Sequence, residues 1–235
     1  YTSQYTLSLH DALPIFTIVE PYATIQAFSS PVKALTFFGN EENLRLIAAK
    51  DNGEFVDWCL PGESFERSKL GAGLAYLGNV GGNLLSFGPS DDGSESCVSL
   101  YSPDFTLIDS LCIPLAPREL NPEKIALSPE NDRIAVGANG EEVYVIDIEQ
   151  GLSPAQLHTF GNSGLSAISW SDGDTIVAAE KESFDLLYYD IDKSSVTKRL
   201  SGRTNPIGAV GLKGDSLGFG HQSIYYINER TPIER

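Results

Sequence analysis

The chain has 235 residues and a formal net charge of −16, with only 16 lysines and arginines against 32 aspartates and glutamates. Because a phosphate-binding surface needs clustered basic side chains, this balance argues against a nucleic-acid partner. The apolar runs are far shorter than the roughly 20 residues of a membrane span, which argues against a membrane partner. The 22 glycines and 13 prolines are typical of many short strands joined by tight turns.

The first segment of the chain is expected to be foreign to the fold. Residues 6–15 resemble the translation of a widely used sequencing adapter, so we treat residues 1–15 as a non-native artefact. His10 and Asp11 are therefore not considered as catalytic residues. Residues 16–28 are predicted to form the third or fourth strand of a repeat that begins upstream, and the lack of any methionine fits an internal fragment.

From residue 29 onward the chain repeats one pattern. Aligning Leu35, Leu74, Ile125, Ile168 and Val210 places successive units about 40 to 50 residues apart. Each unit opens with a short apolar strand, followed by a turn rich in Gly, Asn and Asp and a returning second strand. The opening strands are predicted at 32–37, 73–77, 124–127, 166–170 and 207–212, and the second strands at 44–49, 84–87, 133–138, 175–179 and 216–220.

The second half of each unit also repeats. A third strand with large side chains is predicted at 55–59, 143–148, 186–191 and 224–228. A more variable fourth strand closes most units, as at 106–113, 155–160 and 196–200. Four antiparallel strands cannot bury both faces alone, but they can do so by stacking radially. A β-sandwich, the other all-β arrangement, would not explain why turn residues recur at equivalent places.

The sequence therefore predicts an all-β fold, a β-propeller fragment of about five four-stranded blades. The predicted blades cover residues 29–71, 72–116, 120–161 and 164–202, with an incomplete one at 205–235. Five units are fewer than the usual ring requires, so we expect a fragment at both ends. Exposed sheet edges would then make the isolated molecule prone to associate.

Several of these units resemble WD40 repeats. The third-strand endings Ile146-Asp147, Tyr189-Asp190, Ile227-Asn228 and Trp58-Cys59 stand where that family carries its Trp-Asp pair. Residues 127–137, LSPENDRIAVG, resemble its Ser-Pro-Asp-Gly turn and following strand. The resemblance covers residues 29–229 and implies a rigid ring whose rim loops dock proteins or peptides. No complete Trp-Asp pair and no Gly-His occurs, so we expect the blades to depend mainly on apolar packing.

The three cysteines, Cys59, Cys97 and Cys112, have no metal-ligand spacing. Cys97 and Cys112 could face each other across one hairpin, but an odd number of cysteines favours reduced, buried thiols. No Asn is followed two residues later by Ser or Thr, so the chain has no glycosylation acceptor. Both features favour an intracellular protein of the cytoplasm or the nucleus.

The chain carries no GxSxG, HExxH, P-loop or dinucleotide fingerprint, and we predict no catalytic residue and no cofactor. His158 is expected on an outermost strand, away from any catalytic centre. The aromatic residues of the third strands could be binding anchors, but packing between blades is favoured. They are Trp58, Tyr188, Tyr189, Tyr225 and Tyr226.

The turns between second and third strands should lie on one rim, which makes them the candidate partner-binding site. The candidate residues are Asp51, Asn52, Asp91, Asp92, Asn139, Glu141, Lys181, Glu182 and His221. Several are carboxylates, so a calcium-type oxygen cluster is one alternative, but turn chemistry favours the same residue types and we predict no metal site.

The predicted function is a non-catalytic scaffold for protein–protein interaction. The alternative is a propeller enzyme or a small-molecule- or metal-binding propeller, of the lactonase-like or quinoprotein-like kind. Such a protein would need polar ligands that converge on the central channel. The predicted opening strands, which would line that channel, are poor in histidine and carboxylates.

Overall fold

The computed structural model describes residues 31–39, 44–50, 52–59, 64–70, 73–119, 121–138, 140–149, 151–161, 164–201, 207–213, 216–220 and 224–228. These residues form 19 β-strands and two short 3-10 helices, η1 (Pro117–Glu119) and η2 (Pro122–Lys124). No helix among them has the length and apolar character that crossing a membrane requires. The predicted all-β class is confirmed, whereas residues 1–15 and the strand predicted at 16–28 lie outside the described residues.

The strands form five antiparallel sheets, each made of strands that follow one another in the chain, and we call these sheets blades 1 to 5. Blade 1 contains β1 (Ala34–Phe38), β2 (Arg45–Ala49), β3 (Glu54–Cys59) and β4 (Ser64–Lys69). Blade 2 contains β5 (Tyr76–Val80), β6 (Asn83–Pro89), β7 (Ser96–Tyr101) and β8 (Leu107–Ile113). Blade 3 contains β9 (Ile125–Leu127), β10 (Arg133–Gly137), β11 (Glu142–Asp147) and β12 (Gln156–Thr159).

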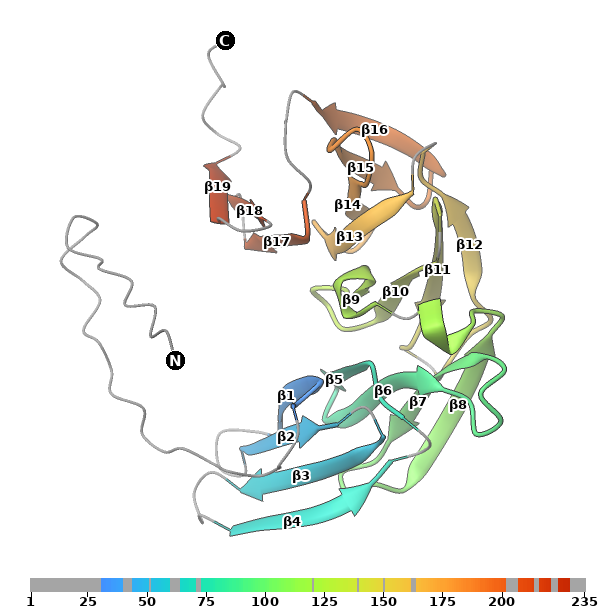
Figure 1. Cartoon of the computed structure of the whole chain (residues 1–235), viewed down its shortest axis with the longest axis vertical. Helices are drawn as coiled ribbons and strands as arrows, with labels where there is room; N and C mark the ends of the chain where they lie inside the picture. Colours follow the sequence, from blue (N-terminus) through green and yellow to red (C-terminus); the bar gives the residue numbers. More distant parts are fainter. Residues whose placement is uncertain are drawn as a thin grey trace, which may run out of the picture.

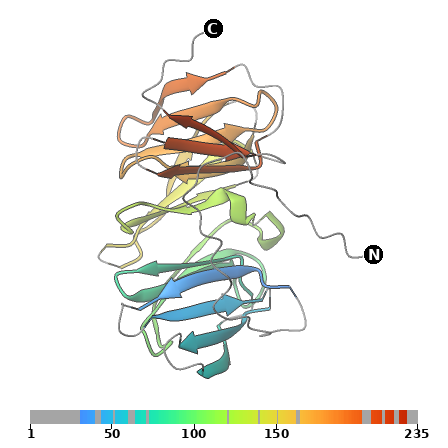
Figure 2. The ribbon, with the colours of Figure 1, turned by 90° about the vertical axis from the view of Figure 1, so that its left-hand side faces the viewer.

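Blade 4 contains β13 (Leu165–Trp170), β14 (Thr175–Glu180), β15 (Leu186–Asp190) and β16 (Ser195–Leu200). Blade 5 has three described strands, β17 (Ala209–Lys213), β18 (Ser216–Gly220) and β19 (Ile224–Asn228). The blades follow one another around an arc, with the first strand of each blade toward its centre and the fourth strand on its outside (Figure 1). The inner strands of neighbouring blades lie close together: β1 beside β5, β9 beside β13, and β13 beside β17. Seen from the side, the sheets are layered one above another (Figure 2).

The hydrophobic core lies between the blades. Phe38 and Ile47 of blade 1 pack with Leu77 and Leu84 of blade 2. On the other face of blade 2, Phe87 belongs to the largest cluster, which it shares with blade 3. Two further clusters join blade 3 to blade 4 and blade 4 to blade 5. Each sheet thus covers an apolar face of its neighbour, which is the radial stacking that the repeats predicted.

Polar contacts at the start of the second strand also join neighbouring blades. Arg45, the first residue of β2, donates to Asp57 of its own blade at 2.9 Å and to the carbonyl of Pro103 in blade 2 at 2.9 Å. Arg133, the first residue of β10, pairs with Asp147 at 3.1 Å and reaches Asp174 in blade 4 at 3.0 Å. In blades 1 and 3, the first residue of the second strand is therefore an arginine that bonds to the next blade.

One side chain closes the β9–β10 turn of blade 3, and another joins blade 4 to blade 3. The buried Ser128 hydroxyl accepts hydrogen bonds from the backbone N–H groups of Asp132 and Arg133 and donates to the Asp132 carboxylate at 2.6 Å. This closes the turn that the sequence likened to a Ser-Pro-Asp-Gly motif. Across the interface, the indole N–H of Trp170 donates to the carbonyl of Ala126 at 2.9 Å.

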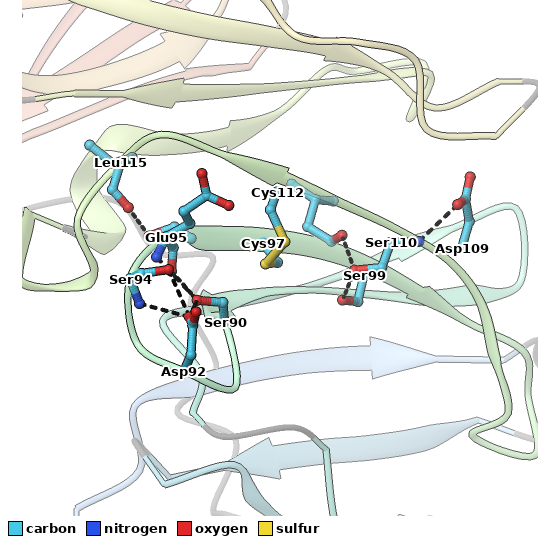
Figure 3. Close-up of a disulfide and its surroundings, with 12 residues drawn as sticks. Ser90, Asp92, Ser94, Glu95, Cys97, Ser99, Asp109, Ser110, Cys112 and Leu115 are labelled. Carbon is cyan, nitrogen blue, oxygen red and sulfur yellow. Dashed lines mark hydrogen bonds between the residues drawn. A yellow bond between two sulfur atoms is a disulfide. The ribbon is translucent and has the colours of Figure 1, made fainter.

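The predicted state of two cysteines was wrong. Cys97 of β7 stands directly opposite Cys112 of β8 in the antiparallel register, and the two form a disulfide (Figure 3). Cys97 is half-buried and Cys112 is exposed, so neither is the buried thiol that was expected. The physical reason is register, because directly paired residues bring their Cβ atoms within disulfide reach. Cys59 is free.

Candidate interaction rim

The turns between second and third strands lie on the same side of the arc as the connections between blades, and we call this side rim one. Backbone hydrogen bonds join the two sets of loops. Leu70, after β4, donates to the carbonyl of Gly53 at 2.9 Å, and Leu165 donates to that of Gly140 at 2.8 Å. Lys181 donates to Gly164 at 2.9 Å, so the connection from blade 3 to blade 4 is held by turns of both blades. The opposite side, which bears the turns between first and second strands, is rim two.

The described candidate residues lie on rim one. Five of them have exposed side chains, and Glu141 is half-buried; the five are Asn52, Asp91, Asp92, Lys181 and Glu182. Asp51, Asn139 and His221 lie outside the described residues. Within the described part of the chain, no hydrogen bond or ion pair joins these candidate side chains from one blade to another. Rim one is therefore a set of separate exposed tips.

The β6–β7 turn is closed by Asp92. Its carboxylate accepts hydrogen bonds from the hydroxyls of Ser90 and Ser94, each at 2.7 Å, and from the Ser94 backbone N–H at 3.0 Å (Figure 3). These bonds, led by the one from the Ser94 backbone, lower the pKa of Asp92 to about 2. Asp92 is thus a turn-forming residue whose Oδ1 accepts all three of these hydrogen bonds, and both Asp92 and its neighbour Asp91 are exposed at this tip.

The β2–β3 turn is built in the same way. The Asn52 side chain accepts a hydrogen bond from the backbone N–H of Glu54 at 3.1 Å, and Gly53 takes a positive φ of 80°. Lys50 forms an ion pair with Glu54 across the turn, and its hydrogen bond is the main reason that the pKa of Glu54 is lowered. Turn formation, which the sequence analysis favoured over a calcium-type cluster, therefore explains why Asn52 and Asp92 stand at these positions.

A buried carboxylate network under the β14–β15 turn escaped the sequence reasoning. Glu180 and Asp185 are buried, and the Arg199 guanidinium binds them at 2.8 and 3.0 Å. The Ser183 hydroxyl donates to Glu180 at 2.5 Å. The hydrogen bond with Asp185 is the main reason that the pKa of Arg199 is raised. The only signal in the sequence was two acids flanking a turn with an arginine on the following fourth strand.

Two of the aromatic side chains that the sequence singled out, Tyr188 and Tyr189, serve packing, whereas Trp58 is half-buried. Tyr188 and Tyr189 are buried, and Tyr189 stacks on Phe160 of blade 3 with ring centroids 4.1 Å apart, so the packing interpretation is confirmed for both. His158 lies on β12, the fourth strand of blade 3, as predicted, and unlike the other residues of that strand it is buried. The side chains of Tyr225 and Tyr226 lie outside the description. Among the described residues, no three His, Cys, Asp or Glu side chains are grouped to hold a metal.

Comparison with known proteins identifies the architecture. No family model matches the chain, and no curated protein matches it. Among solved structures, the β-propeller domain of Cps50 (Swd1) from Myceliophteria thermophila superposes with a TM-score of 0.65 at 16% identity, covering 87% of this chain and 68% of that domain. The chain has a β-propeller fold. This propeller presents an arc of four four-stranded blades and a fifth with three described strands, as the repeat pattern predicted.

Proposed function

We propose that this propeller is a non-catalytic scaffold for protein–protein interaction, and that proteins or peptides dock on rim one. We propose an intracellular site of action, in the cytoplasm or nucleus, and this rests on the lack of a glycosylation acceptor alone, because the Cys97–Cys112 disulfide removes the support that reduced thiols would have given. The likeness to the Cps50 (Swd1) propeller domain establishes the fold, and the proposed function rests on the chemistry of the rim.

The observation that carries the proposal is the contrast between rigid turn backbones and exposed turn tips. The carbonyls of Gly53, Gly140 and Gly164 hold the rim loops together through backbone hydrogen bonds. Asp91 and Glu182 nevertheless keep exposed side chains at the tips. Groups that are fixed before binding lose little conformational entropy when a partner docks, so such a surface favours recognition.

The charges of the rim indicate the class of partner. Of the candidate residues that the structure describes, Asp91, Asp92, Glu141 and Glu182 are acidic, and Lys181 is basic. An acidic rim on a chain with a net charge of −16 attracts positively charged surfaces and repels acidic ones. We therefore propose a basic peptide segment as the preferred ligand.

In the experiment, the immobilised chain captures partners from a cell extract. The captured partners are identified, and their binding to the chain is then measured. Each is titrated against the unaltered protein and against Asp91→Lys with Glu182→Lys. We expect reversal of these two charges to weaken binding by about tenfold or more, because an attraction becomes a repulsion. The matched control is Glu130→Lys with Asp192→Lys, which makes the same charge change at exposed positions of rim two. Equal binding by the unaltered chain and both variants would contradict the proposal.

A further inference from the structure

The Cys97–Cys112 disulfide lies at the outer edge of blade 2, within reach of solvent. Cys97 of β7 is half-buried, whereas Cys112 of the last strand, β8, is exposed. On the same side of the sheet, the next pair along the two strands is Ser99 and Ser110, whose hydroxyls lie 3.0 Å apart (Figure 3). Ser110 is also exposed. The bridge therefore stands beside polar surface residues at the edge of the sheet.

The two cysteines of the bridge differ in their access to a thiol in solution. Cys97 lies on an inner strand of the sheet, where it pairs with Gly88 on one side and with Cys112 on the other. Cys112 lies on the strand at the end of the sheet. In thiol–disulfide exchange a thiolate attacks one sulfur and the other sulfur leaves, and access helps to decide which one is attacked. Exposed disulfides are also the reducible ones in folded proteins, so the geometry favours attack on Cys112.

Strand β8 also carries contacts from the disulfide to blade 3. Asp109 of β8 accepts a hydrogen bond from the backbone N–H of Leu152 at 2.9 Å, and Leu152 lies in the connection between β11 and β12. Leu111, the neighbour of Cys112, packs with Leu152 against the core cluster that blades 2 and 3 share. Within the described sheet, β8 pairs with β7 alone. A bond that fixes β8 on β7 therefore also fixes the contact with blade 3.

We propose that the Cys97–Cys112 disulfide is a reversible redox site, at which a low-molecular-weight monothiol attacks Cys112 and so loosens the contact of β8 with blade 3. The thiolate forms a bond to the Cys112 sulfur as the bond between the two cysteines breaks. Cys97 leaves as a thiolate and takes up the proton that the attacking thiol released.

A second monothiol completes the reaction. It displaces the first from Cys112, so the products are two cysteine thiols and one small-molecule disulfide. The protein is thereby reduced by two electrons, and two monothiols are oxidised. Reoxidation can follow the same route backward, because the antiparallel ladder keeps Cys97 opposite Cys112. This proposal does not depend on binding at rim one.

The first test locates the attacked sulfur on the folded chain, with reduced glutathione as the probe. Cys59→Ser is used throughout to remove the free cysteine. Exchange is stopped early with acid, the chain is cut between the two bridge cysteines, and mass spectrometry locates the mixed disulfide. We expect it on Cys112 in about tenfold excess over Cys97. An excess on Cys97, equal amounts on both, or exchange only under denaturing conditions would overturn the proposal.

A charge beside Cys112 tests the same step through its rate. Ser110→Lys should speed reduction by glutathione about threefold and Ser110→Glu should slow it by a similar factor, because the attacking thiolate is an anion. The matched control is Thr159→Lys, which makes the same charge change at an exposed residue of another fourth strand, β12. The control should react like the parent chain. One common rate for all of these variants would contradict attack on the folded edge of blade 2.

Hydrogen exchange tests the effect on blade 3. Reduction should quicken exchange of the Leu152 amide about tenfold, because the loosened strand holds its acceptor Asp109 less firmly. In Asp109→Ala the Leu152 amide should exchange at the faster rate in both redox states. The amide of Ile191, which donates to the Asp174 carbonyl in blade 4, should not respond to reduction. An unchanged Leu152 amide, or equal acceleration at Ile191, would overturn the proposed link between the disulfide and blade 3.

Discussion

Arg199 is a single residue that compensates two buried acids, Glu180 and Asp185. Both carboxylates are buried at one end of blade 4, and both bind the guanidinium of Arg199 on the outer strand β16. Buried charges are tolerated only when they are paired and hydrogen-bonded. Arg199 therefore stabilises blade 4 mainly by keeping two acids compensated, and its own contact area matters less.

Replacement of Arg199 tests this role. Arg199→Met should lower the free energy of unfolding by about 2 to 3 kcal/mol, at the low end of what a broken buried pair costs because the arginine is itself partly exposed. Chemical denaturation of the two proteins at neutral pH measures the difference. Lys193→Met, which removes an exposed ion pair with Asp190, should leave stability nearly unchanged. Equal effects of the two substitutions would contradict the proposed role.

His158 is the second buried polar residue with a measurable consequence. It is 7% exposed, its Nδ1 lies 3.5 Å from the Tyr189 hydroxyl, and its Nε2 has no hydrogen-bond partner within the described structure. Burial lowers its pKa below the ordinary value of 6.5. The unfolded chain consequently binds a proton on this ring at a higher pH than the folded chain does.

The sign of the pH effect follows from linkage. The contribution of His158 to stability is complete above about pH 6.5 and is lost as the pH falls toward the folded-state pKa. His158→Leu should remove this loss, so its stability should fall less than that of the unaltered chain between pH 7.5 and pH 5.5. Denaturation curves at the two pH values measure both changes. An equal loss of stability in the two proteins would show that the His158 ring does not govern the pH dependence between pH 7.5 and pH 5.5.

At the scale of the element, strand β8 is attached to β7 by both a hydrogen-bonded ladder and the Cys97–Cys112 disulfide. The bridge closes a loop with a sequence separation of 15 residues. A cross-link of this length stabilises a protein by up to about 3 kcal/mol, chiefly by restricting the unfolded chain. The covalent link thus holds the outermost strand of blade 2 in place.

Removal of the bridge should therefore weaken blade 2. Cys97→Ser with Cys112→Ser, or reduction of the unaltered chain, should lower stability by up to about 3 kcal/mol and speed amide exchange in β8. Thermal unfolding with and without dithiothreitol, together with hydrogen exchange, provides the measurement. Cys59→Ser serves as the control because Cys59 is free. If reduction changed neither observable, the bridge would have no structural role.

The strands that the sequence predicted well are those with clear turn residues and apolar runs, such as β10 and β15. It named no fourth strand in blade 1, where β4 has the sequence SFERSK and gives no hydrophobic period. It also named no strand at β7, where the buried Ser96 satisfies its hydroxyl by donating to the Leu115 carbonyl at 2.7 Å. Without β7 the register could not be assigned, so the pairing of Cys97 with Cys112 across a hairpin remained the disfavoured alternative.

The opening strand of blade 2 was predicted at 73–77 and instead spans Tyr76–Val80. The strand continues through Gly78, although glycine weakens strands in general. In this strand a Cβ at Gly78 would lie 3.2 Å from Cε1 of Tyr76, so the glycine gives that ring room. On rim one, the sequence located the exposed tips. It could not locate the network at Glu180, because burial of a carboxylate depends on tertiary contacts.

On the scale of the whole molecule, stability resides in the interfaces between blades. The buried Phe87 of blade 2 belongs to the cluster shared with Ile134 and Val136 of blade 3. In a repeat architecture, each unit is stabilised by its neighbours as well as by its own contacts. A cavity at one interface should therefore weaken both of the blades that meet there.

This coupling can be measured with Phe87→Ala, which should lower the free energy of unfolding by about 3 to 5 kcal/mol. Hydrogen exchange should quicken together in blades 2 and 3, because they share the damaged interface. Leu157→Ala removes an exposed side chain of β12 and should change stability by about 0.5 kcal/mol or less. Faster exchange confined to blade 2 would show that the blades are energetically independent.

The arginines at the start of β2 and β10 imply that the order of the blades is chemically encoded. Besides Asp147 of its own blade, Arg133 reaches forward to the Gly173 carbonyl and the Asp174 carboxylate of the following blade, and Arg45 likewise reaches forward to Pro103. These sheets are not interchangeable modules, even though their backbones are alike. A shuffled chain would lose the pairing of Arg133 with the Asp174 carboxylate, so sequence divergence among the repeats favours the native neighbours.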